Sequence, residues 1–180
     1  MAWTTPITVA TNDILSAAQY NRYVRDNLLE MAPAKATSSG SIFTISAENE
    51  IQERKVSSDV VTTQGQTSSS TYADLDTFGP MVTATCSFAI VTISARMRNV
   101  NNDNRGVYAS FSVSGATTLT ALDRWRIAGN GVKAGNPNRV SATTIVTLNS
   151  GSNTFTMKYK AQATYGPAQF EQRELTIIPL

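Results

Sequence analysis

The chain has 180 residues, 41% of them hydrophobic and only 16% charged, and its formal net charge is +2. It contains no histidine and a single cysteine, Cys86, so imidazole acid–base catalysis, thiol chemistry and the usual zinc sites are disfavoured, and no internal disulfide forms. No stretch collects the lysines and arginines that phosphate-backbone binding needs, and no apolar run approaches roughly 20 residues. We therefore expect no nucleic-acid partner, no membrane span and no secretion signal.

Residues 1–37 predict an N-terminal arm that contains one helix. Residues 3–10 are mostly apolar and interrupted by a proline, which favours an extended backbone. One of residues 11–13 then caps a helix of about residues 12–32, which ends because Pro33 disfavours helical backbone at the residue before it. The apolar residues that recur at helical spacing are Ile14, Ala18, Val24, Leu28 and Met31.

The helix has one narrow apolar stripe, and its other face mixes aromatic and charged residues in the way typical of surfaces that meet another protein. It packs either on its own β domain or on a different chain, and the sequence favours a different chain. The residues expected to make that partner contact are Trp3, Ile7, Ile14, Leu15, Tyr20, Tyr23, Val24 and Leu28.

Residues 38–66 predict a short strand and a tether. The alternation in residues 41–45 indicates the strand, whereas residues 48–61 fit either a further strand or the tether. The stretch 46–67 matches no pattern that assigns it to the β domain or to the linker.

Residues 67–180 predict a β-sandwich, for which a Greek-key or jelly-roll topology is expected. Apolar and polar residues alternate in several segments, which is the pattern of half-buried antiparallel strands. The Gly/Asn-rich segment 149–153 predicts a turn. The fold class is therefore mainly β, an antiparallel jelly-roll-like sandwich preceded by an extended arm and one helix. The clearest strands are 88–99, 107–114, 140–148, 154–161 and 171–179.

Few residues are suited to catalysis or metal binding. Two carboxylate pairs, Asp74 with Asp76 and Glu171 with Glu174, have the composition of a glycosidase pair, but such residues are common on the solvated edges of β proteins. Segment 99–106 is rich in oxygen ligands, yet its single carboxylate favours a hairpin turn over a Ca²⁺ loop. We expect no catalytic residue, no metal and no cofactor, and hence no enzyme.

Trp125 is the main candidate for a surface-ligand contact. Flanked by Arg124 and Arg126, it either stacks on a sugar, anchors a protein contact or lies partly buried under the loop 128–138. The candidate residues for a surface ligand are Trp125, Tyr108 and Tyr165.

Two parts of the sequence resemble a known family. The opening Ala2-Trp3-Thr4-Thr5-Pro6 and the block Asn21-Arg22-Tyr23-Val24-Arg25-Asp26-Asn27 resemble the N-terminal segment of small virion proteins of tailed bacteriophages, especially phages of actinobacteria. In that family a Trp-x-x-Pro start precedes a helix that ends in an Asn-x-x-Val-Arg-Asp-Asn-like block. The segments 154–159 and 168–180 are similar to the closing strands of phage head-decoration and fibre β domains.

The resemblance implies a non-enzymatic structural protein, made in the host cytoplasm and located in the virion. The first function that the resemblance implies is that of a trimeric capsid decoration, or cement, protein, whose N-terminal arm attaches to the major capsid protein or another virion protein. Three linked arms bind far more tightly than one, and binding only the assembled shell stabilises that shell. The alternative is a minor tail or tail-fibre component whose β domain binds a host surface glycan.

Overall fold

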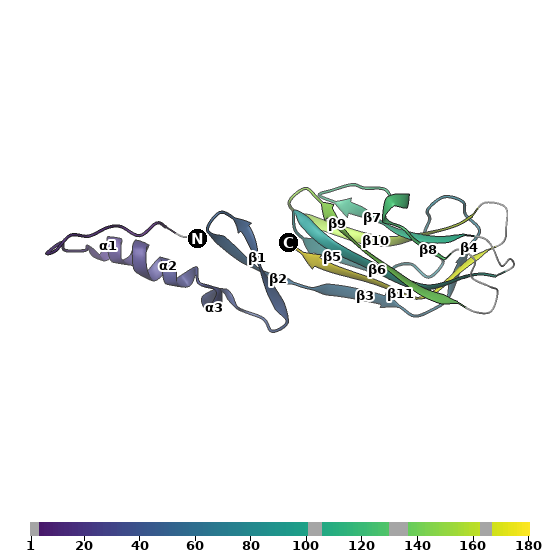
Figure 1. Cartoon of the computed structure of the whole chain (residues 1–180), viewed down its shortest axis with the longest axis horizontal. Helices are drawn as coiled ribbons and strands as arrows, with labels where there is room; N and C mark the ends of the chain where they lie inside the picture. The colour runs from purple at the N-terminus through teal and green to yellow at the C-terminus, as the bar shows by residue number, and fades with distance from the viewer. Residues whose placement is uncertain (1–3, 101–105, 130–136, 163–166) are drawn as a thin grey trace. The chain divides into compact units, whose positions relative to one another are not determined.

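The computed structural model describes residues 4–100, 106–129, 137–162 and 167–180, except for the side chains of residues 32 and 33. The chain forms two compact units (Figure 1). The N-terminal unit comprises Met1–Val56 with Leu180, and the second unit comprises Ser57–Pro179. None of the described helices is both long enough and apolar enough to cross a membrane.

The helical part of the N-terminal unit differs at its start from the predicted helix of residues 12–32. Residues 10–13 form a turn instead, in which Asn12 has a φ of 75° and the Asp13 carboxylate accepts the Ala10 N–H at 2.6 Å. The helix begins after Ser16 because Ser16 and Gln19 form a capping box that satisfies two free N–H groups. It runs through α1 (Ala17–Tyr20), the π-helical turn η1 (Asn21–Arg25) and α2 (Asp26–Leu29).

The end of the helix also differs, because Pro33 does not terminate helical structure. Pro33 lies inside a separate short helix, α3 (Ala32–Lys35). A proline is tolerated in the first turn of a helix, since its missing N–H would have no intrahelical partner there.

A β-hairpin completes the N-terminal unit. Strands β1 (Ser41–Ala47) and β2 (Glu50–Lys55) pair antiparallel. The strand predicted over residues 41–45 is thus confirmed, and much of the undecided stretch after it is also strand.

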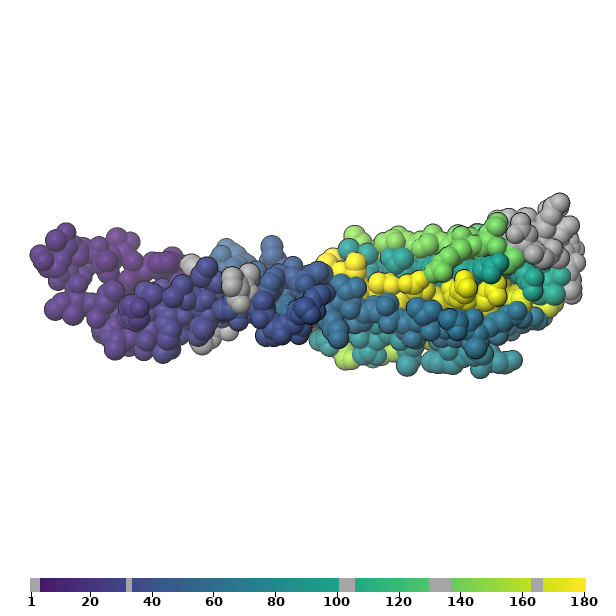
Figure 2. Space-filling model, turned by 90° about the horizontal axis from the view of Figure 1, so that it is seen from below, coloured from purple at the N-terminus to yellow at the C-terminus, as the bar shows by residue number. Residues whose placement is uncertain are grey.

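The second unit is built from two antiparallel sheets. One has the order β3-β11-β6-β9, with β4 also paired to β11, and the other has the order β5-β10-β7-β8. In Figure 2 the yellow strand β11 lies next to β3 in blue, and β6 separates it from β9 in green. The elements are β3 (Ser57–Val61), β4 (Gly65–Thr67), β5 (Met81–Thr85), β6 (Phe88–Asn99), β7 (Val107–Gly115), the 3-10 turn η2 (Asp123–Trp125), β8 (Ile127–Gly129), β9 (Asn138–Thr147), β10 (Ser152–Ala161) and β11 (Ala168–Pro179).

This strand order is a jelly roll, which confirms the predicted fold class. The chain changes sheet at nearly every step, from β5 to β6 to β7, and again from β8 through β9 and β10 to β11. The predicted turn at 149–153 is present, with Gly151 at a φ of 136°, but it leads from one sheet to the other. Strands β6 and β7 likewise lie in different sheets, so segment 99–106 is not a hairpin turn, and its residues 101–105 fall outside the described residues.

The sandwich begins earlier than the predicted boundary at residue 67. Strands β3 and β4 lie within the range 38–66 that was expected to be strand and tether, yet both pair with β11. Their pairing partner is the last strand of the chain, so local sequence patterns carry no information about it.

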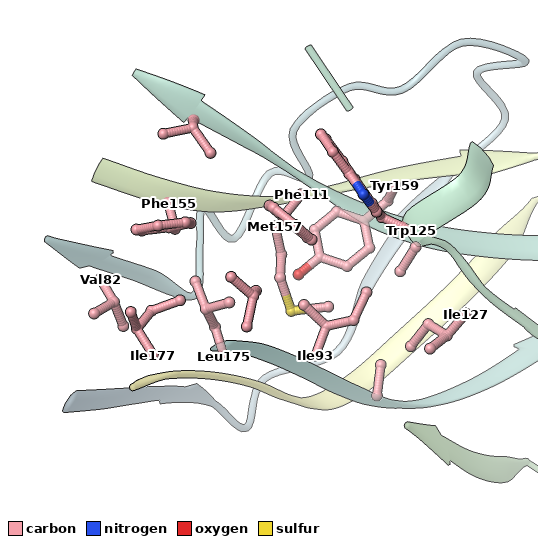
Figure 3. Packing of buried hydrophobic residues seen from close by; sticks show 14 of the residues in the cluster. Val82, Ile93, Phe111, Trp125, Ile127, Phe155, Met157, Tyr159, Leu175 and Ile177 are labelled. Carbon is pink, nitrogen blue, oxygen red and sulfur yellow. The ribbon is translucent and has the colours of Figure 1, made fainter. Parts of the chain in front are cut away.

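The core lies between the two sheets (Figure 3). Side chains of β7 and β10, such as Phe111, Phe155 and Met157, face Ile93 of β6 and Leu175 of β11. The alternation predicted for β6 is confirmed, because Ala89, Val91, Ile93, Ala95 and Met97 are all at most 1% exposed. Cys86 is buried, as the sequence predicted.

Candidate functional site

The N-terminal unit is held together by polar contacts, and Asn27 makes three of them. Asn27 is 5% exposed, and its amide donates to the carbonyl oxygens of Thr4 at 2.7 Å and Tyr23 at 3.1 Å. Its Oδ1 accepts the Thr4 N–H at 2.8 Å. These bonds fix the extended segment alongside the helix, where Figure 1 shows it running next to α1 and α2. The Asn of the Val-Arg-Asp-Asn block is therefore a structural clamp.

The connection between α3 and the hairpin is also polar. Lys35 Nζ donates to the Ile51 carbonyl at 3.0 Å and pairs with Glu30 at 2.5 Å. The Glu53 carboxylate accepts the Thr37 hydroxyl at 2.6 Å and the N–H groups of Thr37 and Ser38 at 2.9 Å. The Thr37 hydroxyl bond, followed by the backbone bonds, lowers the pKa of Glu53 to about 2, because each bond favours the charged form.

We expect Thr37→Val to raise the pKa of Glu53 from about 2 toward its usual range, because the largest cause of the shift is removed. The folded pKa lies below the unfolded one, so the contribution of this carboxylate to stability is present above the usual range and lost as pH falls toward 2. A ¹³C NMR titration of the carboxyl group measures both values. Thr44→Val, on the same hairpin, is the control, and an unshifted Glu53 in the unaltered protein would contradict the assignment.

The apolar side chains of the N-terminal unit have no core of their own. Among the described side chains of residues 4–56, Asn27 is the only one that is buried. Ile14 is 93% exposed and Ile45 is 80% exposed. We call the large hydrophobic residues that remain exposed here the exposed apolar set, and they are Val9, Ile14, Leu15, Tyr20, Leu28, Leu29, Met31, Phe43 and Ile45.

The predicted contact residues fall into three groups in the structure. Ile14, Leu15, Tyr20 and Leu28 belong to the exposed apolar set. Ile7, Tyr23 and Val24 are half-buried, and Trp3 lies outside the described residues.

Sequence reasoning missed several members of this surface. Leu29 was not identified, and Met31 was placed in the apolar stripe but not among the contact residues, while the hairpin residues Phe43 and Ile45 alternate on β1. Alternation predicted the strand, but it could not show that no second layer covers it. The role of Asn27 was also missed, although an asparagine inside a helix is unfavourable and usually signals a specific partner.

The three candidate residues for a surface ligand do not form one site. Trp125 is 7% exposed, its ring stacks on Phe111 at 5.0 Å, and the Arg124 guanidinium lies 4.5 Å over it. Its indole therefore belongs to the core and is not an exposed platform for a sugar. Tyr108 is half-buried beneath the Arg126 guanidinium at 4.5 Å, and Tyr165 lies outside the described residues.

Three of the four carboxylates in the two predicted pairs contact cations. Asp74 binds Lys158 at 2.7 Å, Glu171 lies 3.3 Å from Arg96, and Glu174 lies 2.5 Å from Arg139. Within the described part of the chain, no group of three or more acidic, cysteine or histidine side chains is arranged to hold a metal ion.

Comparison with known proteins gives only distant likenesses. No family model matches the chain, and no curated protein matches its sequence. The structure of infectious bursal disease virus Gx strain is similar over 76% of this chain and 36% of the virus chain, at 13% identity and a TM-score of 0.40. This chain thus spans about a third of that virus chain.

Two carbohydrate-binding modules also show a likeness. The CBM22-1 xylan-binding domain of Paenibacillus barcinonensis Xyn10C matches over 81% of this chain and 90% of its own, at 13% identity and a TM-score of 0.35. The module CBM6cm-2 of Cellvibrio mixtus lichenase 5A, in complex with cellotriose, matches over 83% and 94%, at 16% identity and a TM-score of 0.34. At these scores the fold assignment rests on the strand pairing described above.

Proposed function

We propose that this chain is a non-enzymatic structural protein of a phage virion that attaches to a neighbouring polypeptide through its N-terminal unit. The observation that carries the proposal is the contrast between the two units. The sandwich buries a continuous apolar core, whereas the exposed apolar set of the N-terminal unit meets no covering layer in its own unit. Exposed apolar groups on this scale mark surfaces that bind other proteins.

The energetics favour a partner for this unit. Completely burying one large apolar side chain contributes about 1.5–3 kcal/mol, and the set has several to offer. A polar clamp such as Asn27 contributes less, because a typical hydrogen bond adds only about 1 kcal/mol net. Polar contacts thus fix the conformation of the helix and hairpin, while contacts with the partner supply most of the free energy that stabilises the unit.

The specific form that we propose is a trimeric capsid decoration protein. The partners are two further copies of the chain and the major capsid protein or another virion protein, and the attachment residues include Trp3, Ile7, Ile14, Leu15, Tyr20, Tyr23, Val24 and Leu28. Trimerisation makes the second and third attachments intramolecular, so weak single contacts suffice. The cation contacts of Asp74, Glu171 and Glu174 support a non-enzymatic role, because paired surface carboxylates are ordinary in β proteins.

The test is particle binding by a double variant, Ile14→Asp with Leu28→Asp. Two carboxylates in an apolar contact leave buried charges without partners, so we expect binding to virions that lack the protein to fall at least about 100-fold. Co-sedimentation measures binding, and analytical ultracentrifugation measures the oligomeric state.

The matched control is Ile145→Asp, which alters a 66% exposed isoleucine on β9 of the sandwich. We expect it to bind as the unaltered chain does. Equal binding by the double variant and this control would overturn attachment through the N-terminal unit.

A second candidate function is a minor tail or tail-fibre component whose sandwich binds a host surface glycan. A groove on the sandwich favours it: this groove lies between segments 70–74 and 120–123 and carries paired charges. Counting copies per virion separates the two functions, because hundreds of copies indicate decoration and a handful indicate a tail.

A further inference from the structure

The outer face of the sheet β5-β10-β7-β8 carries a groove of about 740 Å³. One wall is segment 70–74, the other is segment 120–123, and the floor is formed by Ser112 of β7 with Lys158 and Lys160 of β10. This volume lies within the range of small-molecule sites in proteins.

Both walls are bonded to the sheet beneath them. Ala73 exchanges two backbone hydrogen bonds with Tyr159 of β10, at 2.9 and 3.0 Å. On the other side, the Ser110 hydroxyl of β7 donates to the Leu122 carbonyl at 2.8 Å. The groove is therefore formed in advance of any ligand, which lowers the entropic cost of binding.

The charged side chains of the groove occur as neutralised pairs. Lys158 Nζ donates to both carboxylate oxygens of Asp74, at 2.7 and 2.8 Å. Lys160 Nζ donates to Asp123 Oδ1 at 2.6 Å. The lining residues thus contribute two positive and two negative charges, which sum to zero.

Tyr72 joins the second of these pairs. Its hydroxyl donates to Asp123 Oδ1 at 2.8 Å, and the Lys160 ammonium lies 4.5 Å over its ring. Bonds from Lys160 and then Tyr72 lower the pKa of Asp123, while burial and then Asp123 raise the pKa of Tyr72. At neutral pH the carboxylate is charged and the phenol remains a neutral donor. Arg126 also contacts Asp123, at 3.1 Å.

We propose that this groove binds a neutral saccharide. Hydroxyl groups of a sugar both donate and accept, so they can use the remaining lone pairs of Asp74 and Asp123 and the remaining protons of the two ammonium groups. The hydroxyls of Ser70, Thr71, Ser112 and Thr120 add further donors and acceptors around the lining. A charged ligand would have to break a pair that is already made at 2.8 Å or less.

The inference deepens the second proposed function, on which it rests for the choice of ligand, and it is independent of attachment through the N-terminal unit. It also replaces Trp125 by Tyr72 as the aromatic residue at the ligand site. Trp125 is part of the core, whereas the ring of Tyr72 is half-buried and lines the groove.

The experiment is affinity electrophoresis of the full chain in gels that contain dextran, mannan, xylan or galactan, with polygalacturonate as the acidic probe. The groove variants are Lys158→Met and Tyr72→Phe, which remove an ammonium group and a hydroxyl group. The control is Thr83→Val on β5, which lies in the same sheet outside the groove lining. Circular dichroism verifies that each variant is folded.

We expect at least one neutral polysaccharide to retard the unaltered chain, and Lys158→Met to weaken that binding at least tenfold while Thr83→Val leaves it unchanged. Neutral polysaccharide binding that both groove variants retain would overturn the groove assignment and leave the second proposed function standing. Binding to polygalacturonate alone would overturn the ligand class. Binding to none of the probes would overturn both the inference and the second function, while co-sedimentation with virions would still report on attachment.

Discussion

Arg173→Met is expected to lower the free energy of unfolding of the sandwich by about 3 kcal/mol, since it removes the four hydrogen bonds that a buried, charged guanidinium donates. Arg173 is fully buried on β11. Its guanidinium donates to the Thr77 carbonyl at 2.7 Å, the Thr77 hydroxyl at 2.6 Å, the Gly79 carbonyl at 3.0 Å and the Thr63 carbonyl at 3.2 Å. One side chain thus holds two loop segments against the sheet.

Methionine keeps much of the volume of arginine, so the loss arises mainly from hydrogen bonding. After the substitution, the Gly79 carbonyl still accepts the Tyr159 hydroxyl at 2.8 Å. The carbonyls of Thr63 and Thr77 lose the guanidinium N–H groups that they accept in the unaltered chain. Urea unfolding followed by far-UV circular dichroism measures the change.

The matched control is Arg96→Met on β6, which removes a half-exposed ion pair with Glu171 at 3.3 Å. Exposed pairs contribute about 0–1 kcal/mol, so this variant is expected to change stability little. Equal effects of the two substitutions would show that the buried guanidinium is not what holds the loop segments.

The burial of Arg173 illustrates where sequence reasoning ends. Alternation predicts β11, and it places residue 173 on the same face as Leu175 and Ile177. A bulge between Glu171 and Glu174, with Gln172 at a φ of 46°, shifts the register, so the alternation of inward and outward side chains changes phase before residue 173. The carbonyl groups that make an arginine acceptable in the core come from residues 63–79, far away in sequence.

The long strands β6, β7, β9, β10 and β11 were predictable because each has its own local period, whereas the short strands β3, β4, β5 and β8 were not identified. The inward faces of β6, β7 and β10 follow the apolar alternation, and the jelly-roll topology matches the expected class. The helix start was not predictable from the caps alone, since Asp13 and Ser16 are both good cap residues. Gln19 distinguishes them, because only Ser16 has a partner three residues later that completes a capping box.

The exposed apolar set was partly predictable and the groove was not. Apolar spacing identified Ile14 and Leu28, whose exposure follows from the absence of a second layer in their unit. The groove joins segment 70–74, segment 120–123 and strand β10, which meet only through the sheet order β10-β7. Its residue types are ordinary surface residues, so composition alone gives no signal.

Asn153→Asp is expected to destabilise the sandwich by about 4 kcal/mol at pH 7, since it places a carboxylate against backbone carbonyl oxygens. Asn153 is fully buried, and its Nδ2 donates to the carbonyls of Cys86 at 3.2 Å, Asn149 at 3.1 Å and Gly151 at 3.1 Å. Its Oδ1 accepts the Thr117 N–H at 2.9 Å. The aspartate side chain keeps this acceptor and loses both donors.

The loss depends on pH in a defined direction. Burial and the three carbonyl oxygens raise the folded pKa of the introduced carboxyl above its unfolded value of about 3.9. The charge penalty is therefore absent below about pH 4, where both states are protonated, and grows as pH rises toward the folded pKa. The difference in unfolding free energy between the variant and the unaltered chain, measured in urea at pH 4 and pH 7, should be larger at pH 7.

Asn149→Asp, at an exposed amide that donates to the Ala116 carbonyl at 3.0 Å, should show little of this dependence. A loss of stability in Asn153→Asp that does not depend on pH would mean that water reaches the carboxyl. The amide of Asn153 would then not exclude water from the three loop segments that it bonds.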